Sequence, residues 1–316
     1  METHRVNLKF LSSGMMLSFA AFALFSISDA CSKGLAGQLD PFEVAFSGGI
    51  FGFLILPFIR KPQESYSDIF ATDRPSMWLL RAFATFVSTA SSVMAFMLLP
   101  MPEALSLMFL MPFFVTLISV GILKEKVSGW TWLSVGVGFL GVLIVLRPGV
   151  RAFHLGHFCA VIAAMANAAS VIAYRLAGNQ SARLSLFGSS LFGPLIGDGL
   201  LMLAHATWPH GAGNWALLFG YGFLAALGQL FMMMATALAP ANRVALPQYS
   251  QMLWAVAFSY LLFHQPLDNW TFVGIVIVTL SGMLHWVRQK LHYERLALEG
   301  HWQKHHTSSR PPAEVT

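Results

Sequence analysis

A long internal repeat constrains this chain more than any other feature. Residues 122–147 (ILKEKVSGWTWLSVGVGFLGVLIVLR) are echoed 140 positions later by residues 262–287 (LFHQPLDNWTFVGIVIVTLSGMLHWV). The offset spans about five apolar segments of membrane-crossing length, so we predict that one unit occurs twice. A unit with an odd number of crossings inserts its second copy upside down. Inverted copies around a site at the membrane centre are typical of secondary transporters.

The composition points to a membrane protein. Of the 316 residues, 56% are hydrophobic and only 10% are charged, whereas a soluble domain carries about 25% charged residues. Runs of eighteen or more apolar residues are long enough to cross a bilayer. The fold class that we predict is an all-α membrane protein with ten transmembrane helices, arranged as two inverted five-helix repeats. The expected spans are 13–34, 41–60, 77–99, 103–122, 129–147, 154–174, 183–206, 214–237, 243–264 and 269–287.

The basic residues predict how the chain is oriented. With both termini in the cytoplasm, sixteen of the 19 Lys and Arg residues lie on the cytoplasmic side, and only Lys33, Arg147 and Arg151 lie on the far side. This asymmetry follows the positive-inside rule. Because these charges are scattered through short loops, we do not expect nucleic-acid binding. The predicted organisation is a cytoplasmic N-terminus (1–12), a first repeat (13–147), a second repeat (154–287) and a polar cytoplasmic tail (288–316).

The first span carries a polar stripe. Ser26, Asp29 and Lys33 follow helical spacing and share one face, and such a stripe should face a cavity or another helix rather than lipid. Two interpretations stay open: Asp29 and Lys33 form a structural ion pair, or Asp29 is a substrate-binding or protonatable carboxylate, with Lys33 as a partner in coupling. The counterparts 141 positions later, on one face of the sixth span, are Asn167, Ser170 and Tyr174.

The ninth span carries a second polar cluster. Gln248, Tyr249, Gln251 and Trp254 lie within two turns near mid-membrane, and Gln229 of the eighth span could join them. Amides beside a large aromatic ring suit a planar or heteroaromatic solute, which stacking and hydrogen bonds would hold. The alternative is that these side chains hydrogen-bond neighbouring helices. We favour the substrate interpretation because four such residues cluster tightly.

Two further charged residues lie inside predicted spans, and the common catalytic and metal-binding motifs are missing from the sequence. Arg81, one turn inside the third span, either reaches the cytoplasmic headgroups or attracts an anion. For Asp198, near the middle of the seventh span, we expect a hydrogen bond to a neighbouring helix. The chain has no phosphate-binding glycine loop and no ligand-spaced Cys/His/Asp cluster. We therefore expect no enzyme activity, no cofactor and no metal site.

Two segments resemble a known family. ALSLMFLMPFFVTLISVGILKEKVSGWTWLSVGVGFLGVLIVLRPG (residues 104–149) is similar to the EamA domain of the drug/metabolite transporter superfamily, and ALPQYSQMLWAVAFSYLLFHQPLDNWTFVGIVIVTLSGML (residues 245–284) resembles the same domain again. The resemblance covers residues 13–288. It implies a ten-helix fold with cytoplasmic termini and a central cavity that includes the polar stripes. The family's acidic residue before the last helix of each repeat is present as Glu125, but its second counterpart is Gln265.

The resemblance also implies a function. Pro41–Phe46 and Gln248-Tyr249-x-Gln251 are most similar to members associated with S-adenosylmethionine or riboflavin uptake. We predict a secondary transporter of a small polar organic solute in the bacterial inner membrane. Export of amino acids, drugs or metallophores is the main alternative, ahead of an intramembrane enzyme or a non-transporting scaffold. The expected partners are the solute and the lipid bilayer, with protons as a candidate coupling ion and a homodimer as a candidate assembly.

Overall fold

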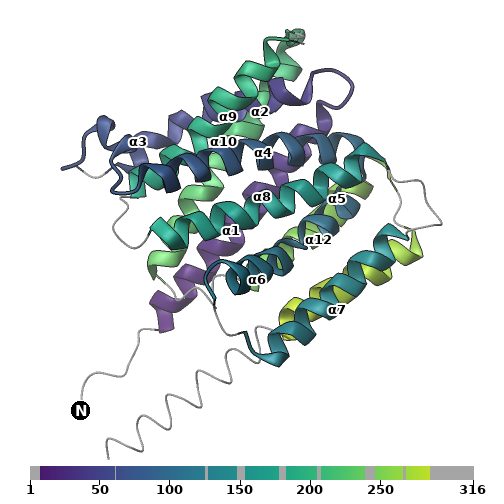
Figure 1. The fold of residues 1–316 in the computed structure, drawn as a ribbon. Helices are drawn as coiled ribbons and strands as arrows, with labels where there is room; N and C mark the ends of the chain where they lie inside the picture. Colours follow the sequence, from purple (N-terminus) through teal and green to yellow (C-terminus); the bar gives the residue numbers. More distant parts are fainter. Residues whose placement is uncertain are drawn as a thin grey trace, which may run out of the picture.

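The fold is entirely helical in the part of the chain that the structure describes. This structure is a computed structural model, and it describes residues 8–60, 62–124, 127–147, 154–177, 183–204, 208–238, 246–265 and 268–284. Within these ranges there is no β-strand. The helices gather into one bundle (Figure 1). The predicted all-α class is therefore confirmed. The predicted tail and Glu125 lie outside the described residues.

The helices follow each other along the chain with short connections. The first half contains α1 (Leu8–Gly34), α2 (Pro41–Gly52), η1 (Phe53–Ile55), α3 (Leu56–Ile59), η2 (Tyr66–Phe70), α4 (Pro75–Leu98), α5 (Met101–Met108), α6 (Met111–Gly121) and α7 (Gly129–Leu146). The second half contains α8 (Leu155–Ala177), α9 (Arg183–Met202), α10 (Gly211–Leu238), η3 (Leu246–Tyr249), α12 (Ser250–Leu261) and a helix at Asn269–Leu284.

Eight helical segments in the described residues are long and apolar enough to cross a membrane. They correspond to the first eight predicted spans. The predicted ninth span is represented by η3 and α12, and the tenth by Asn269–Leu284, which is shorter than the other eight segments. Both of these predicted spans extend into residues that the structure does not describe, so the described residues contain eight candidate spans.

The fourth predicted span is broken in the middle. We expected one helix over 103–122, but α5 ends at Met108 and α6 begins at Met111. Pro112 lies in the first turn of α6. Because proline has no N–H to donate to a carbonyl four residues earlier, it ends the α5 ladder at Met108. A matching break occurs 140 positions later, where η3 ends at Tyr249 and α12 begins at Ser250.

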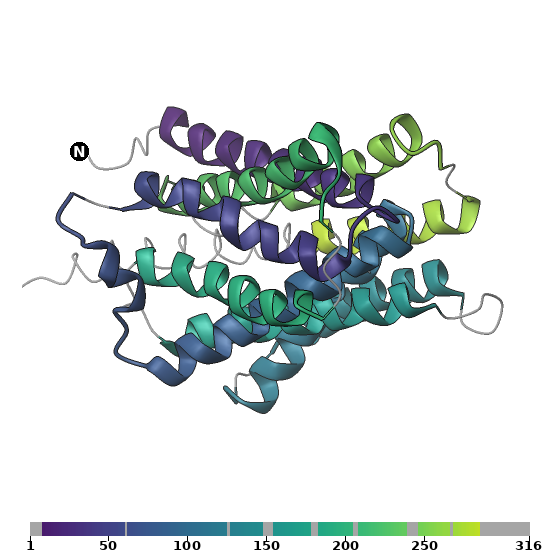
Figure 2. The same cartoon turned by 90° about the horizontal axis from the view of Figure 1, so that it is seen from above.

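The packing of the helices repeats itself between the two halves. The most extensive contacts are α1 with α10 and α4 with α8. These two pairs exchange under the repeat, because α8 is the counterpart of α1 and α10 is the counterpart of α4. In Figures 1 and 2 the purple α1 runs beside the green α10. Each repeat therefore packs its first span against the third span of the other repeat.

The last helices of the two repeats show that the copies are inverted. In Figure 1 the yellow helix Asn269–Leu284 lies along α7. Ser281 Oγ donates a hydrogen bond to the carbonyl of Ser134, and the backbones of Gly141 and Gly274 approach closely. Under the 140-residue offset, Ser134 corresponds to Gly274 and Ser281 corresponds to Gly141, so the two contacts are equivalent. The residue numbers increase along α7 as they decrease along the helix Asn269–Leu284, so these two equivalent helices are antiparallel.

Candidate functional site

A polar bridge joins the two repeats through residues that the sequence singled out. Gln251 Nε2 of α12 donates a hydrogen bond to Asp29 Oδ2 of α1, at 3.1 Å. Both side chains are partly buried. They come from the two separate polar clusters, 222 positions apart in the chain. The bridge therefore places a carboxylate and an amide at a contact between α1 and α12.

Lys33 does not form the ion pair with Asp29 that was one of the two interpretations. Its Nζ instead donates to the carbonyl oxygens of Phe96 and Leu99, at 3.1 and 2.6 Å, and lies 5.5 Å from the ring centre of Phe263. The last carbonyls of a helix lack intrahelical partners and carry partial negative charge. Lys33 therefore caps the end of α4, and that interaction replaces the predicted pairing.

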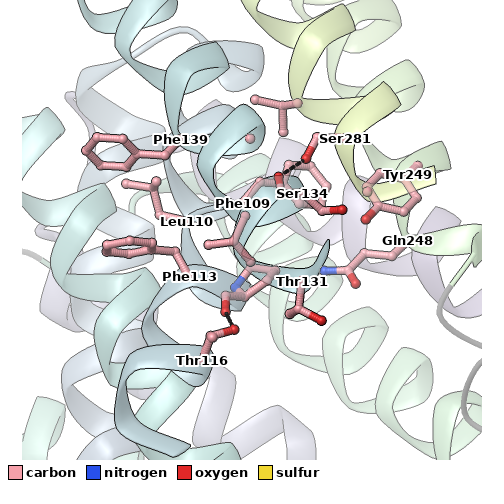
Figure 3. Close-up of a pocket in the computed structure, with 15 residues that line it drawn as sticks. Phe109, Leu110, Phe113, Thr116, Thr131, Ser134, Phe139, Gln248, Tyr249 and Ser281 are labelled. Atoms are coloured by element: carbon pink, nitrogen blue, oxygen red, sulfur yellow. Dashed lines mark hydrogen bonds between the residues drawn. The ribbon is translucent and has the colours of Figure 1, made fainter. Parts of the chain in front are cut away.

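A pocket of about 230 Å³ lies between α6, α7, η3 and the helix Asn269–Leu284. Figure 3 shows Gln248 pointing into it, with Tyr249 beside Ser281. The pocket brings together two predicted residues, Gln248 and Tyr249. Its other lining side chains are those of Phe109, Leu110, Pro112, Phe113, Thr116, Thr131, Ser134, Val135, Phe139, Val278 and Ser281, completed by the backbones of Gly138 and Gly282.

The hydroxyl groups of this pocket were not predicted from the sequence. Thr131, Ser134 and Ser281 line it from the last helix of each repeat. Their signal was present, because Thr131 and Ser134 are three residues apart and so share a helix face. Residues 131–139 of α7 line the pocket. The end of α7 lies near the end of α1 that carries Lys33, because Leu146 and Ala30 belong to one core cluster. We call the end of the bundle that holds Lys33 the Lys33 side. The opposite end, where α1 begins at Leu8, is the Leu8 side.

Two equivalent aromatic rings meet at the edge of this pocket. Phe109 and Tyr249 are 140 positions apart, and their rings stack with centroids 5.8 Å apart and an interplanar angle of 15°. Offset-stacked rings stabilise a contact beyond their buried area. A Cβ atom at Gly282 would overlap the Tyr249 ring and hydroxyl. Gly282 thus leaves the space that Tyr249 occupies.

The remaining predicted residues do not gather at one point. Trp254 is 41% exposed and stacks on Phe258, and it lines neither the pocket that contains Gln248 nor the pocket that contains Gln229. Asn167 is exposed, whereas Ser170 is buried. Ser26 is buried and donates to the carbonyl of Phe22 in its own helix. Arg81 is partly buried near the start of α4, and the side chain of Tyr174 lies outside the described part.

Gln229 lies in a second pocket rather than with Gln248. This pocket has a volume of about 210 Å³ and lies between α1, α2, α4, α9 and α10. Thr85, Thr89, Ser190 and Tyr221 supply its other polar side chains. The two pockets share no lining residue, so the expected cluster of Gln229 with Gln248 does not form.

Polar contacts close the Lys33 side between the two repeats. His157 Nε2 of α8 lies 3.0 Å from Glu103 Oε1 of α5, and both side chains are buried. Arg147 at the end of α7 pairs with Asp268, which precedes the last helix. The pairing of Glu103 with His157 was not predicted from the sequence.

Asp198 lacks the hydrogen bond that we expected. It is fully buried in α9, and neither carboxylate oxygen has a hydrogen-bond partner in the part of the chain that the structure describes. The described residues also contain no group of three or more His, Cys, Asp or Glu side chains that could hold a metal ion.

With this geometry established, comparison with known proteins identifies the family. The model of the EamA-like transporter family matches residues 12–147 and 154–286. The chain belongs to this family. It carries two EamA repeats, as the resemblance of its two halves suggested. A solved crystal structure of another protein shares the fold, with a TM-score of 0.58 and 16% sequence identity over 90% of this chain and 99% of that one.

Three relatives show the range of solutes within the family. The S-adenosylmethionine uptake transporter of Rickettsia prowazekii (strain Madrid E) is 26% identical over 86% of this chain and 91% of its own length. The riboflavin transporter of Vibrio cholerae is 28% identical over 77% and 82%. The pseudopaline exporter CntI of Pseudomonas aeruginosa is 24% identical over 87% and 96%. The family and these relatives are transporters, not enzymes, and the apolar helices make this EamA protein a multi-pass inner-membrane protein.

Proposed function

We propose that this EamA protein carries a small polar organic solute across the bacterial inner membrane by alternating access. The observation that carries the proposal is the hydrogen bond between Asp29 and Gln251, because each residue belongs to a different repeat. When one repeat rocks against the other, this contact separates and frees a carboxylate and an amide for a solute. Sites at the interface of inverted repeats are the common arrangement in secondary transporters.

The contacts on one side of the bundle and the pocket on the other support a carrier that is closed on one side. On the Lys33 side, the pairs His157–Glu103 and Arg147–Asp268 join the repeats. The pocket that contains Gln248 and Tyr249 lies toward the Leu8 side. If both termini are cytoplasmic, as the distribution of Lys and Arg predicts, this state is closed to the outside and its pocket lies toward the cytoplasm.

The chemistry of these residues favours a solute with a cationic group and a planar ring. Asp29 accepts from a neutral amide, so an ionised carboxylate there would keep its charge for a cation. The aromatic rings of Phe109, Phe113 and Tyr249 line the nearby pocket and suit stacking with a flat heterocycle. S-adenosylmethionine combines a cationic sulfonium with an adenine ring, and we take this class of metabolite as the first candidate. Riboflavin and amino-acid derivatives are the next candidates.

A counterflow assay tests this function without presuming a direction. Purified protein in liposomes loaded with unlabelled S-adenosylmethionine should take up labelled S-adenosylmethionine, since an importer and an exporter both exchange solute across the membrane. Asp29→Asn removes the charge and should lower the rate by about tenfold or more, a factor that corresponds to about 1.4 kcal/mol. Gln251→Ala should lower it as well.

The matched control is Asp73→Asn, an identical change at an exposed loop position, which should keep the wild-type rate. Riboflavin and a panel of amino acids are tested in parallel. The absence of exchange for every solute would reject the transport proposal for these substrate classes. Equal rates for Asp29→Asn and wild type would reject Asp29 as a binding residue while leaving transport intact.

A further inference from the structure

Asp198 occupies an enclosed position between three helices. It lies in α9, flanked by Gly197 and Gly199, and its side chain is fully buried. A Cβ atom at Gly197 would overlap the Phe86 ring of α4, and one at Gly199 would overlap the Phe46 ring of α2. The two glycines therefore let the α9 backbone approach two aromatic rings, which leaves the carboxyl group in an apolar wall.

Nothing in the surrounding helices satisfies this carboxyl group. Both Asp198 oxygens are inaccessible and without a hydrogen-bond partner among the described residues. The ionisable side chains on the elements packed against α9 are Glu43 of α2, Arg81 of α4, and Tyr66 and Asp68 of η2. Tyr221 of α10 lies within electrostatic reach of both Asp198 and Asp29. No hydrogen bond from any of these groups reaches Asp198.

A carboxylate cannot remain ionised in such a place. Burying an unpaired charge away from water is so costly that the group takes up a proton instead. We therefore expect the carboxyl group of Asp198 to be neutral while α9 is packed in this way. A purely apolar residue would pack there at lower cost, because it has no polar atoms to desolvate. The position therefore uses a group that can change its charge.

The location of Asp198 connects its charge to the transport cycle. α2 and α9 are equivalent helices of the two repeats, and they pack against each other at the interface between the repeats. If one repeat rocks against the other, this interface opens and water reaches Asp198. We propose that Asp198 is a proton-binding site, which holds a proton while α2 and α9 are packed together and releases it when they separate. This inference rests on the proposed transport function for its coupling, but not for the protonation itself.

Proton binding at Asp198 and solute movement are linked reciprocally. A proton that binds only the closed arrangement stabilises that arrangement, and the same coupling makes solute movement depend on the proton gradient. Replacement by asparagine keeps the shape and the neutral state but removes the exchangeable proton. Asp198→Asn should therefore cycle without using the gradient.

Infrared spectroscopy tests the protonation independently of transport. In lipid nanodiscs at neutral pH, wild type should show the carbonyl band of a protonated carboxyl group, which Asp198→Asn lacks and Asp29→Asn retains. Asp198→Leu is a second variant that removes the carboxyl group without adding an amide, and either folded variant suffices for the comparison. A band that is absent from wild type, or unchanged in both Asp198 variants, would overturn the proton site.

Proteoliposomes test the coupling. With labelled S-adenosylmethionine, wild type should accumulate solute or drive it out under an imposed pH gradient, and Asp198→Asn should lose this effect while its counterflow at equal pH stays within about twofold of wild type. Wild-type counterflow without any response to the gradient, or an equal response in the variant, would overturn the coupling. Absence of counterflow in wild type would instead count against the proposed substrate, and the infrared result would still decide protonation.

Discussion

His157 donates its Nε2 hydrogen to Glu103, and a backbone contact fixes which nitrogen carries that hydrogen. The N–H of His154 donates to Nδ1 of His157 at 3.0 Å, so Nδ1 is an acceptor and the hydrogen resides on Nε2. The pair joins α5 of the first repeat to α8 of the second, with side-chain exposures of 4% for His157 and 8% for Glu103. Each residue is thus held in place by the opposite repeat.

Loss of this pair should destabilise the protein. His157→Ala removes the donor to a buried carboxylate, and we expect it to lower the free energy of unfolding by about 1–3 kcal/mol. His157→Gln supplies an amide N–H at a similar distance and should retain part of the stability. Thermal unfolding in detergent measures both. His210→Ala, the same change at an exposed position, is the control; an equal loss in that variant would argue against the pair.

Lys33 and Asp29 should contribute independently to the stability of the protein. Lys33→Met leaves the carbonyls of Phe96 and Leu99 without their charged donor and should cost about 1–3 kcal/mol of stability. Because Asp29 bonds Gln251 instead, the stability changes of Lys33→Met and Asp29→Asn should add within about 0.5 kcal/mol in the double variant. A larger coupling energy in this double-mutant cycle would indicate an ion pair between them. Lys124→Met, at an exposed position, controls for the loss of one charge.

Gly282 should not tolerate a side chain. In Gly282→Ala the new Cβ atom would overlap Tyr249, which must leave its stacking position on Phe109. We expect the melting temperature to fall by several degrees, as overpacking typically costs about 1–3 kcal/mol. Combining it with Tyr249→Ala should restore part of the loss, because the obstructing ring is gone.

Gly136→Ala is the matched control for that prediction. A Cβ atom at Gly136 would meet no other atom within 4 Å, and alanine is a better helix former than glycine by about 1 kcal/mol. This variant should therefore melt at the wild-type temperature or slightly above it. Similar melting temperatures for Gly282→Ala and Gly136→Ala would show that Tyr249 does not fill the space beside Gly282.

Thiol labelling should reveal the orientation. In a background with Cys31→Ser and Cys159→Ser, cysteine is introduced at Gln38 or at Ser67, both in exposed positions at opposite ends of α2 and its continuation. A membrane-impermeant maleimide added to right-side-out vesicles should label Gln38→Cys directly and Ser67→Cys only after permeabilisation. The reverse pattern would place both termini outside.

The sequence predicted the helices better than their contacts. The repeat and the apolar runs were enough for the all-α class and the EamA family, because span length and hydropathy are local properties. Asp29 and Gln251 were each recognised as polar residues in apolar helices, but nothing local indicated that they would meet. The spacing of Asp29 and Lys33 allowed an ion pair. The competing partner of Lys33 was the end of α4, which lies more than sixty positions away and becomes visible only in the packed fold.

The break between α5 and α6 was likewise not predicted from the local sequence. Pro112 was visible in the sequence, yet the surrounding apolar run favoured one continuous span. Trp254 was placed at the site because of its depth in the span, whereas its exposure depends on which neighbour covers that face of α12. Asp198 was expected to find a donor, and whether it does so depends on the neighbouring helices, whose Phe46 and Phe86 rings pack against the glycines on either side of it.

The stacked pair of Phe109 and Tyr249 has a consequence for how the duplicated module diverged. Two identical subunits would present identical rings across their axis, and either half could then play either role. The single hydroxyl on Tyr249 breaks that equivalence at the place where the halves meet. The two modules are therefore no longer interchangeable, and a chain built from two copies of the first half would lose this polar atom beside its pocket.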